Sequence, residues 1–171
     1  MGFFFADDAP KFPDIRWMNR DHLSQVLAID RAGFPHRHDP PWPYSAFAAI
    51  LAEHTAAGIV WASGDSVQGF LVYEFWSGHI LITRLCVKPS RRRQGVGTAL
   101  LGRIEGKLAD GFHNRLVVHT HERNSVAHAF LARAGFKATL ARDHYKHPTA
   151  DSYLFSRGIG VAGAVGAGRG R

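Results

Sequence analysis

The amino-acid sequence predicts an α+β domain in which helices pack on a mixed, mostly antiparallel sheet. Two observations lead to this class. Three β-branched and aromatic runs follow one another between residues 59 and 87, and segments with helical apolar spacing precede and follow them. With 171 residues, 46% apolar content and 20% charged residues, the chain is long enough for one globular domain with its own core.

The N-terminal part predicts two helices joined by a stiff loop. Residues 19–32 carry apolar side chains at near-helical spacing behind a candidate cap at Asn19, and Gly33 ends the pattern. Four prolines between residues 34 and 45 exclude regular structure there. Helical spacing then resumes in the segment YSAFAAILAEH, at residues 44–54.

The middle of the chain predicts three antiparallel strands. They correspond to the runs IVWAS, VQGFLVYEFW and HILITRLCV, which are separated by the turn signals SGD and SG. Pro89 ends the third run, because proline has no N–H to donate to a strand ladder.

The C-terminal half predicts alternating helices and strands. A long helix is expected from about Arg93 to Ala109, then a short strand at RLVVHT, then a helix with Asn124 as its N-cap. Two strands should complete the sheet, at about 137–145 and 152–156. The last fourteen residues hold six glycines and no side chains that build a core, so they predict a flexible tail. We therefore expect an N-terminal extension at 1–13, the domain at 14–157 and the Gly-rich tail at 158–171.

The charge of the chain predicts an anionic partner. A net charge of +7 and a pI near 10.1 suit nucleic acid, an anionic membrane surface or a phosphorylated small molecule, and do not choose among them. The single cysteine, Cys86, excludes an internal disulfide, and no apolar run is long enough for a signal peptide or a membrane span. These features favour a cytoplasmic protein that does not enter the membrane.

The segment RRRQGVGTALL, residues 91–101, places three arginines and two glycines where a strand ends and a helix begins. Cations at a helix N-terminus cost about 0.3–1 kcal/mol each, so bare helix stability does not explain them. A glycine-bearing turn at this point forms a nest of backbone N–H groups that binds phosphate oxygens, and a bound polyphosphate makes the arginines favourable. A solvated basic helix start is the alternative.

Other nucleotide-binding motifs do not fit this segment. A P-loop requires a lysine after the glycines, and none follows here. A dinucleotide fingerprint requires a third glycine where Leu100 stands.

The pattern Arg92-Arg93-Gln94-Gly95-Val96-Gly97 after the strand LCVKPS, together with NSVAHAFLARAGF, resembles the GNAT superfamily of acyl-CoA-dependent N-acyltransferases. IDRAGFP and DHYKHPTADSYLF extend the resemblance over residues 14–157 and are most similar to the subgroup that acetylates the N-terminal alanine of ribosomal proteins. The resemblance implies a sheet of six to seven strands flanked by about four helices. It also implies acetyl-CoA as cosubstrate, direct acetyl transfer and no metal.

The resemblance assigns cofactor contacts residue by residue. The main chain of one strand would contact the pantetheine arm, the turn after it would hold the pyrophosphate, and a residue before the last helix would touch the cofactor or act only as an N-cap. The implied cofactor residues are Leu85, Cys86, Val87, Arg92, Arg93, Gln94, Gly95, Val96, Gly97, Thr98 and Asn124. Cys86 is interpreted as a core residue and not as a nucleophile, since no histidine partner stands beside it.

The catalytic positions depart from the family pattern. An amine attacks a thioester only when neutral, so a base or water must remove its proton. His119 stands where the usual glutamate base is found, and Leu131 replaces the usual tyrosine acid. His119 is therefore either the base or a packed histidine. Tyr145 is either a replacement acid or a wall of the acceptor groove, and Glu74 and Glu122 are reserve bases or surface charges.

A metal site is not expected. His119 and His121 share a strand face, but neither they nor the remaining histidines form a recognised ligand spacing; those histidines are His36, His38, His144 and His147.

The predicted function is an acetyl-CoA-dependent N-acetyltransferase that acts on a peptide N-terminus or a small amine, as a monomer or homodimer. The acceptor is expected between the aromatic loop, with Phe34, Trp42 and Tyr44, and residues 144–151. These aromatic residues can instead seal the core. A nucleic-acid-binding module and a non-catalytic acyl-CoA sensor are the alternatives, although the arginines cluster on one turn and are not spread over a face with stacking aromatics.

Overall fold

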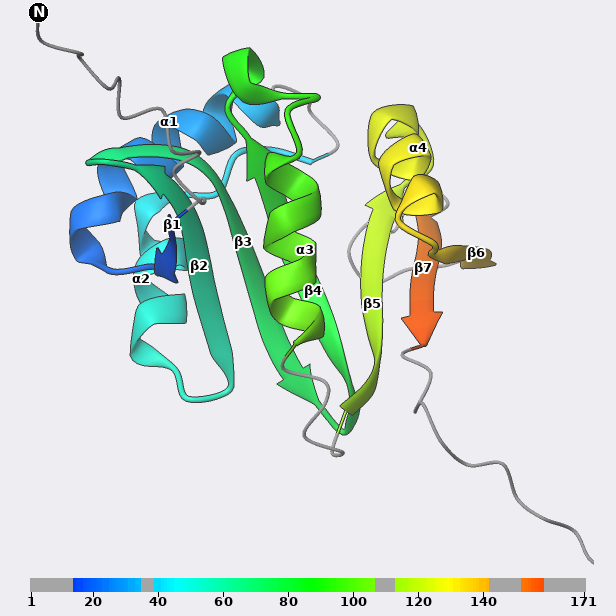
Figure 1. Ribbon diagram of the computed structural model, residues 1–171. Helices are drawn as coiled ribbons and strands as arrows, with labels where there is room; N and C mark the ends of the chain where they lie inside the picture. Colours follow the sequence, from blue (N-terminus) through cyan, green and yellow to red (C-terminus); the bar gives the residue numbers. More distant parts are fainter. Residues whose placement is uncertain (1–13, 35–38, 107–112, 142–151, 159–171) are drawn as a thin grey trace, which may run out of the picture.

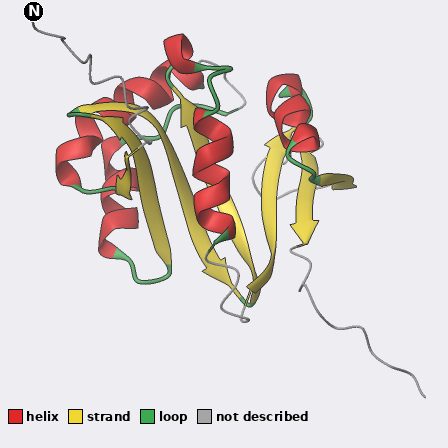
Figure 2. Ribbon diagram, in the orientation of Figure 1, coloured by secondary structure: helices red, strands yellow, loops and turns green. Residues whose placement is uncertain are grey.

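The computed structural model describes residues 14–34, 39–106, 113–141 and 152–158. These residues form seven strands and four α-helices, together with two short 3-10 turns at Arg20–His22 and Pro89–Arg91 (Figures 1 and 2). The strands are β1 (Asp14–Trp17), β2 (Ala56–Ser63), β3 (Ser66–Trp76), β4 (Gly78–Val87), β5 (His113–His121), β6 (Lys137–Ala141) and β7 (Ser152–Gly158). The helices are α1 (Leu23–Gly33), α2 (Tyr44–Ala52), α3 (Val96–Glu105) and α4 (Ser125–Arg133).

The strands form one sheet in the order β1-β2-β3-β4-β5-β7-β6. Every neighbouring pair is antiparallel except β4 and β5, which are parallel. A parallel pair needs a crossover between its strands, and α3 provides it. The predicted α+β class, the mostly antiparallel sheet and the numbers of strands and helices are confirmed.

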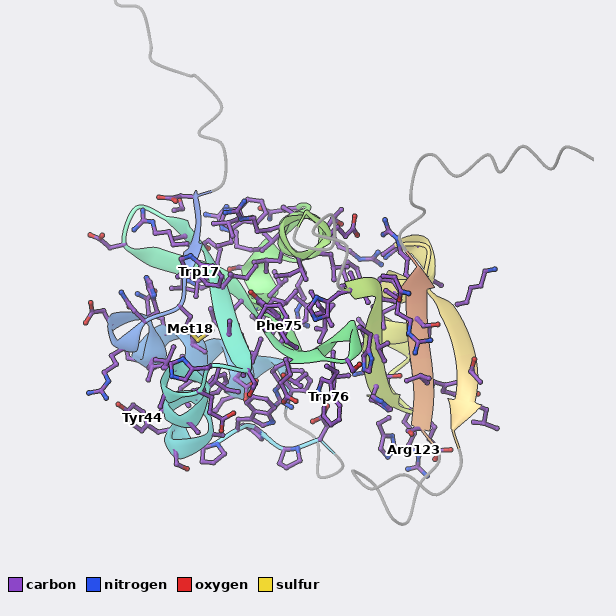
Figure 3. The ribbon with its side chains drawn as sticks, turned by 90° about the horizontal axis from the view of Figure 1, so that it is seen from below. Trp17, Met18, Tyr44, Phe75, Trp76 and Arg123 are labelled. Carbon is purple, nitrogen blue, oxygen red and sulfur yellow. The ribbon has the colours of Figure 1, made fainter. Side chains whose placement is uncertain are left out.

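Helices cover both faces of the sheet, as the view from below shows (Figure 3). On one face, α1 and α2 bury a cluster that includes Val26, Phe47 and Phe70. On the other face, α3 and α4 bury a second cluster that includes Leu100 and Leu131. The sheet therefore has two apolar faces, which explains why β3 reads as an almost continuous apolar run.

The structure differs from the sequence-based expectations in one additional strand and in several element boundaries. The strand β1 was not predicted, because four residues are too few for a strand pattern; it pairs with β2 from Asp14↔Ala62 to Trp17↔Ile59. The first helix opens with a 3-10 turn that Asn19 caps. The helix α3 begins at Val96 and not at Arg93, because Arg93 and Gly95 both have positive φ angles that no α-helix contains.

The expected termini lie mostly outside the described residues. This holds for the extension at 1–13, for the tail from residue 159 onward and for the second half of the strand expected at 137–145. The last described strand, β7, reaches Gly158, one residue beyond the expected domain end.

Candidate cofactor and acceptor site

A β-bulge in β4 sets up the site. The register pairs Val72 with Arg84 and Tyr73 with Ile82, so Thr83 is an extra residue in β4. A bulge bends a strand and reverses which face its later side chains occupy. Ile82 accordingly packs in the cluster under α3, whereas Arg84 and Cys86 contact α1.

Beyond the bulge, β4 and β5 separate (Figure 1). Their pairing ends at Ile82↔Val118, although β4 continues to Val87 and β5 to His121. We call these segments, residues 83–87 and 119–121, the split. The described β4–β5 register has no pairs along these segments, so an extended ligand with amide groups can lie between them.

The turn after β4 has a backbone suited to an anion. Arg93 has φ 63° and Gly95 has φ 83°. A non-glycine residue in the left-handed region costs about 1–2 kcal/mol, which is typical of functional turns. Gly95 is the N-cap of α3 and makes no side-chain cap, so the first N–H groups of this ten-residue helix have no capping side chain. The turn therefore combines a backbone nest with the positive end of a helix.

Side chains of the basic segment donate hydrogen bonds to residues outside it, and these bonds hold the turn in place. Arg91 Nε donates to Gln68 Oε1 at 3.1 Å, and Arg92 Nε donates to the Val87 carbonyl at 3.2 Å. Gln94 donates to the Ser90 carbonyl at 3.1 Å. Residues 91–95 are all exposed. The predicted basic turn is thus ordered and accessible, and the Val87 carbonyl already has a partner.

The two glycines of the turn serve different purposes. Gly95 supplies the positive φ, and a Cβ there would meet nothing within 4 Å. Gly97 lies in α3, where a Cβ would stand 3.2 Å from Phe130 Cζ on α4 and 3.7 Å from Val87 Cγ2. The second glycine therefore allows α3, α4 and β4 to approach one another beside the split.

Cys86 is a core residue. Its thiol is buried and donates a hydrogen bond to the Ile29 carbonyl at 3.4 Å. Burial, and then the nearby charge of Asp30, raise the pKa of this thiol to about 11. A protonated, buried thiol is a poor nucleophile, which supports the interpretation made from the sequence.

His119 lies in the split, one residue beyond the last β5 residue that pairs with β4. Its neighbour Val118 packs toward α3, so alternation turns the half-buried His119 side chain to the α1 face, the face that Arg84 also occupies. At the position of the usual acid, Leu131 is 2% exposed inside the apolar core. Tyr145 and residues 144–151 lie outside the described part of the chain.

The reserve bases are engaged elsewhere. Glu74 accepts a hydrogen bond from Trp76 Nε1 at 3.1 Å, near the far end of the β3–β4 hairpin. Glu122 is exposed and forms an ion pair with Arg123 at 3.7 Å. Glu74 pairs with Leu81, before the split begins, whereas Glu122 directly follows the split and is held in an exposed ion pair.

Asn124 caps α4, since its Oδ1 accepts a hydrogen bond from the Ala127 N–H at 3.1 Å. Its cofactor contact stays a prediction. His128, which the sequence analysis did not select, lies on the same helix with Nε2 2.9 Å from Thr120 Oγ1 and 3.1 Å from the His121 carbonyl. Because a carbonyl only accepts, Nε2 of His128 carries a proton.

Within the described ranges, no three His, Cys, Asp or Glu side chains gather to hold a metal ion. His121 is buried, with Nδ1 accepting from the Arg123 N–H at 3.1 Å, and His36, His38, His144 and His147 lie outside these ranges. No helix in the described segments is long and apolar enough to cross a membrane.

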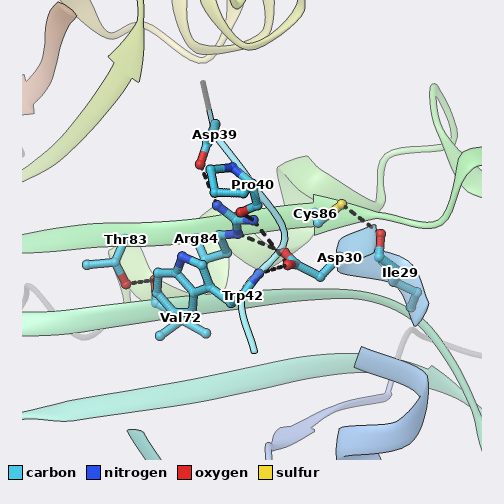
Figure 4. A network of polar contacts seen from close by, with 9 residues as sticks. All are labelled: Ile29, Asp30, Asp39, Pro40, Trp42, Val72, Thr83, Arg84 and Cys86. Carbon is cyan, nitrogen blue, oxygen red and sulfur yellow. Dashed lines mark hydrogen bonds and ion pairs between the residues drawn. The ribbon is translucent and has the colours of Figure 1, made fainter. Parts of the chain in front are cut away.

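A polar network that the sequence did not predict lies on the α1 face (Figure 4). Arg84 forms ion pairs with Asp30 at 2.7 Å and Asp39 at 2.6 Å, and Trp42 N–H donates to Asp30 at 2.7 Å. The Phe34 ring stacks under the guanidinium, and the distance from its centroid to Arg84 Cζ is 3.5 Å. Sequence patterns give no signal for this network, because Arg84 is 54 residues from Asp30 and 45 from Asp39.

The aromatic residues expected around the acceptor have two different roles. Phe34 and Trp42 pack against Arg84 and against the core under α1 and α2. Tyr44, at the first turn of α2, is 56% exposed (Figure 3). Phe34 and Trp42 thus seal the core, as the alternative states, whereas Tyr44 does not.

A separate groove of about 570 Å³ lies on the opposite face, between α3 and the end of α4. It is lined by Thr98, Leu101, Gly102, Glu105, Arg133, Ala134, Gly135 and Arg157. Arg157 and Glu105 form an ion pair at 2.8 Å in its wall. Of the predicted cofactor residues, Thr98 lines this groove, whereas no residue of the split does.

Comparisons with known proteins agree with this geometry. No curated protein sequence matches the chain. The structure is similar to the ribosomal-protein-S18-alanine N-acetyltransferase from Escherichia coli, with a TM-score of 0.72, 21% identity and coverage of 89% of this chain and 97% of that chain. It is similar to NAA60 from Arabidopsis thaliana in complex with a bisubstrate analogue (TM-score 0.72, 18% identity, coverage 86% and 98%).

A third similar structure is the PaiA N-acetyltransferase from Thermoplasma acidophilum in complex with coenzyme A, with a TM-score of 0.68, 14% identity and coverage of 85% and 98%. At these identities the likeness shows the shared fold. The sequence itself matches the family model described as the acetyltransferase (GNAT) family over residues 23–136. This match covers well over half of the chain, and the chain therefore belongs to the acetyltransferase (GNAT) family.

Proposed function

We propose that this protein is an acetyl-CoA-dependent N-acetyltransferase, which moves an acetyl group directly from the thioester to a primary amine. The observation that carries the proposal is the position of the split directly before the left-handed turn of α3. The split offers strand-edge partners to the amides of a pantetheine arm, and the turn offers N–H groups to a diphosphate. One ligand with both parts is coenzyme A.

The residues present fit this ligand. Gly95 has the φ that a nest requires, Gly97 allows α3 to pack closely on Phe130 beside the split, and the first turn of α3 lacks a side-chain cap. We assign the pantetheine contacts to Leu85, Cys86 and Val87, and the pyrophosphate contacts to residues 92–98. When bound, acetyl-CoA supplies an acetyl group activated as a thioester. The protein's own residues then have to bind and deprotonate the amine.

We propose His119 as the group that takes the proton from the amine. Most amines are protonated at pH 7, and a neutral imidazole is the side chain best suited to accept a proton near neutrality. The support is its place in the split, on the face opposite α3 and α4. Leu131 offers no proton for the departing thiolate, so water or Tyr145 is left as the source.

For the acceptor we propose a peptide N-terminus or a small amine on the α1 face. The support is the subgroup resemblance and two similar structures, the ribosomal-protein-S18-alanine N-acetyltransferase from E. coli and the A. thaliana NAA60 complex with a bisubstrate analogue. The single buried cysteine fits a reducing compartment, and we place the enzyme in the cytoplasm as a monomer or homodimer.

A non-catalytic acyl-CoA sensor is the second candidate, favoured by one observation: a core leucine replaces the usual acid at residue 131. The discriminating experiment measures free thiol release from acetyl-CoA with a panel of peptides, amino acids, polyamines and aminoglycosides. Acceptor-dependent release is expected from the enzyme. Tight acetyl-CoA binding in calorimetry without release for any acceptor would instead identify a sensor.

The same protein tests the nucleic-acid alternative. We expect any binding to random-sequence DNA to weaken steeply between 50 and 200 mM salt, since proteins that bind mainly to phosphates lose about 10³- to 10⁵-fold in affinity over this range. We also expect coenzyme A to displace the DNA. Tight DNA binding at physiological salt that coenzyme A does not displace would overturn the assignment of the arginines to the cofactor.

A further inference from the structure

The network around Arg84 has an unusual place in the fold. Arg84 follows the bulge directly, in the part of β4 that forms the split, and it is 4% exposed. Its Nε and Nη2 engage the two carboxylate oxygens of Asp30 at 2.7 and 3.0 Å. Nη1 reaches Asp39 at 2.6 Å, and Nη2 also donates to the Pro40 carbonyl at 2.9 Å. One side chain thus joins β4, α1 and the segment before α2.

This geometry requires an arginine. A guanidinium is planar and offers five donors in a fixed fork, so it can engage one carboxylate with two bonds and still reach two further acceptors. It can also stack on aromatic rings, as it does here on Phe34 at 3.5 Å and Trp42 at 5.1 Å. A lysine has a single point charge and keeps only part of this set.

The network fixes residues 39–43, which we call the acceptor wall. Four contacts tie the acceptor wall down: the Asp39 ion pair, the Pro40 carbonyl, the stacking of Trp42 and the bond from Trp42 N–H to Asp30. Apart from an isolated β-bridge at Asp39 and from Pro43, the N-cap of α2, the described acceptor wall is not part of a helix or of a sheet ladder. Its position relative to β4 therefore depends on Arg84.

The acceptor wall lies on the same side of the sheet as His119. Arg84 is two residues beyond the last β4 residue paired with β5, and His119 is one residue beyond the last paired residue of β5. Both side chains occupy the α1 face. Arg84, with one positive charge, forms ion pairs with two carboxylates, those of Asp30 and Asp39. Of these two carboxylates, only that of Asp39 reaches solvent, with 36% of its side chain accessible. Among these three described side chains, one negative charge is left over.

We infer that Arg84 is a positioning residue for the acceptor: it holds the acceptor wall beside the split and presents the Asp39 carboxylate to the incoming amine. The inference rests on the proposed function, since it assumes that an amine enters on the α1 face. A protonated amine carries a positive charge, so a fixed carboxylate attracts it before His119 removes the proton. Arg84 itself does not contact the reacting atoms.

The test compares Arg84→Lys and Asp39→Asn with the wild-type enzyme, using the fastest acceptor found in the thiol-release panel. Each variant should raise the KM for the amine about 10- to 100-fold, the range expected from losing a charge-assisted hydrogen bond, with the acetyl-CoA Kd within about twofold. The double variant should be no worse than the poorer single variant, because both changes disrupt one arrangement. Ile104→Val, at a fully buried position in the other core, controls for lost stability and should leave the KM unchanged.

A second measurement does not depend on turnover. Hydrogen exchange at the Trp42 amide, which is bonded to Asp30, should speed up at least tenfold in Arg84→Lys and stay at the wild-type rate in Ile104→Val. If no amine is acetylated but this exchange still responds to Arg84→Lys, the proposed function has failed and the anchoring stands. If the enzyme is active and both variants keep the wild-type KM, or if they weaken acetyl-CoA binding instead, the positioning role is overturned. Asp39→Asn keeps the test decisive if Arg84→Lys does not fold, because it leaves the Arg84–Asp30 pair in place.

Discussion

Replacing Gly97 by glutamate tests the anion-binding turn most directly. The variant adds a carboxylate to the first turn of α3, the turn assigned to the diphosphate; its Cβ would face Phe130 and Val87, so the carboxylate has to extend from that interface toward the turn. Two like charges about 4 Å apart repel by about 4 kcal/mol at an effective dielectric constant near 20. That energy corresponds to about a thousandfold weaker binding of acetyl-CoA.

Part of any loss comes from bulk, because a Cβ at residue 97 would lie 3.2 Å from Phe130 Cζ. Gly97→Gln has the same size without the charge and separates the two effects. Gly102→Ala is the control for the helix itself, since its Cβ would meet nothing within 4 Å and should stabilise α3 by up to about 1 kcal/mol. At Gly97 the gain in helix propensity is opposed by overpacking, which costs about 1–3 kcal/mol.

The assay is calorimetric titration with acetyl-CoA at low and high salt, alongside thermal unfolding of each variant. Gly97→Glu should bind about a thousandfold more weakly than Gly97→Gln at low salt, and the gap should shrink as salt screens the repulsion. Equal affinities for the two variants would refute the charge argument. Wild-type affinity in Gly97→Glu would show that the diphosphate does not bind at this turn.

Three further predictions concern the base and the core beside it. His119→Ala should slow transfer about 10²- to 10⁴-fold at saturating cofactor and remove the rise of rate with pH, because only the neutral imidazole accepts a proton. An acceptor whose own ionisation lies below the tested range isolates this effect, and an unchanged rate and profile would make His119 structural. Gly33→Ala should lower the free energy of unfolding in urea by at least about 1–3 kcal/mol, because its Cβ would overlap Cys86 Sγ. Adding Cys86→Ala to this variant should restore most of the lost stability, and no restoration would contradict the contact. The Cys86 thiol, with a pKa raised to about 11 by burial, is protonated at pH 8 and should react with a thiol reagent far more slowly in the native protein than after unfolding; equal rates would disprove its burial.

The sequence by itself determined those features that neighbouring residues produce together. The turn at residues 91–97 is one of them, because the arginines, the glycines and the start of α3 are consecutive, and the nest needs no distant partner. The three strands between residues 56 and 87 are another, since their composition and short turns act locally. The family followed from such local motifs, and the match over residues 23–136 confirms it.

Only the tertiary structure decided how β4 continues after Ile82. The bulge at Thr83 shifts the register between β4 and β3 by one residue. The apolar run HILITRLCV gives no sign of this shift. The bulge directs Arg84 and Cys86 to the α1 face, and the pairing with β5 ends at Ile82, the residue before the bulge. Strand pairing is a property of two segments, and a one-residue change in register reverses the faces of every later side chain.

The Arg84 network and the face occupied by His119 likewise depend on contacts between distant segments. Arg84 reads in the sequence as one polar residue in an apolar strand, and Asp30 as a surface charge near the end of a helix. Folding brings these residues, 54 positions apart, into a buried pair at 2.7 Å. No local pattern predicts such a pair, because a buried charge is tolerated only where a partner from elsewhere in the chain compensates its lost hydration.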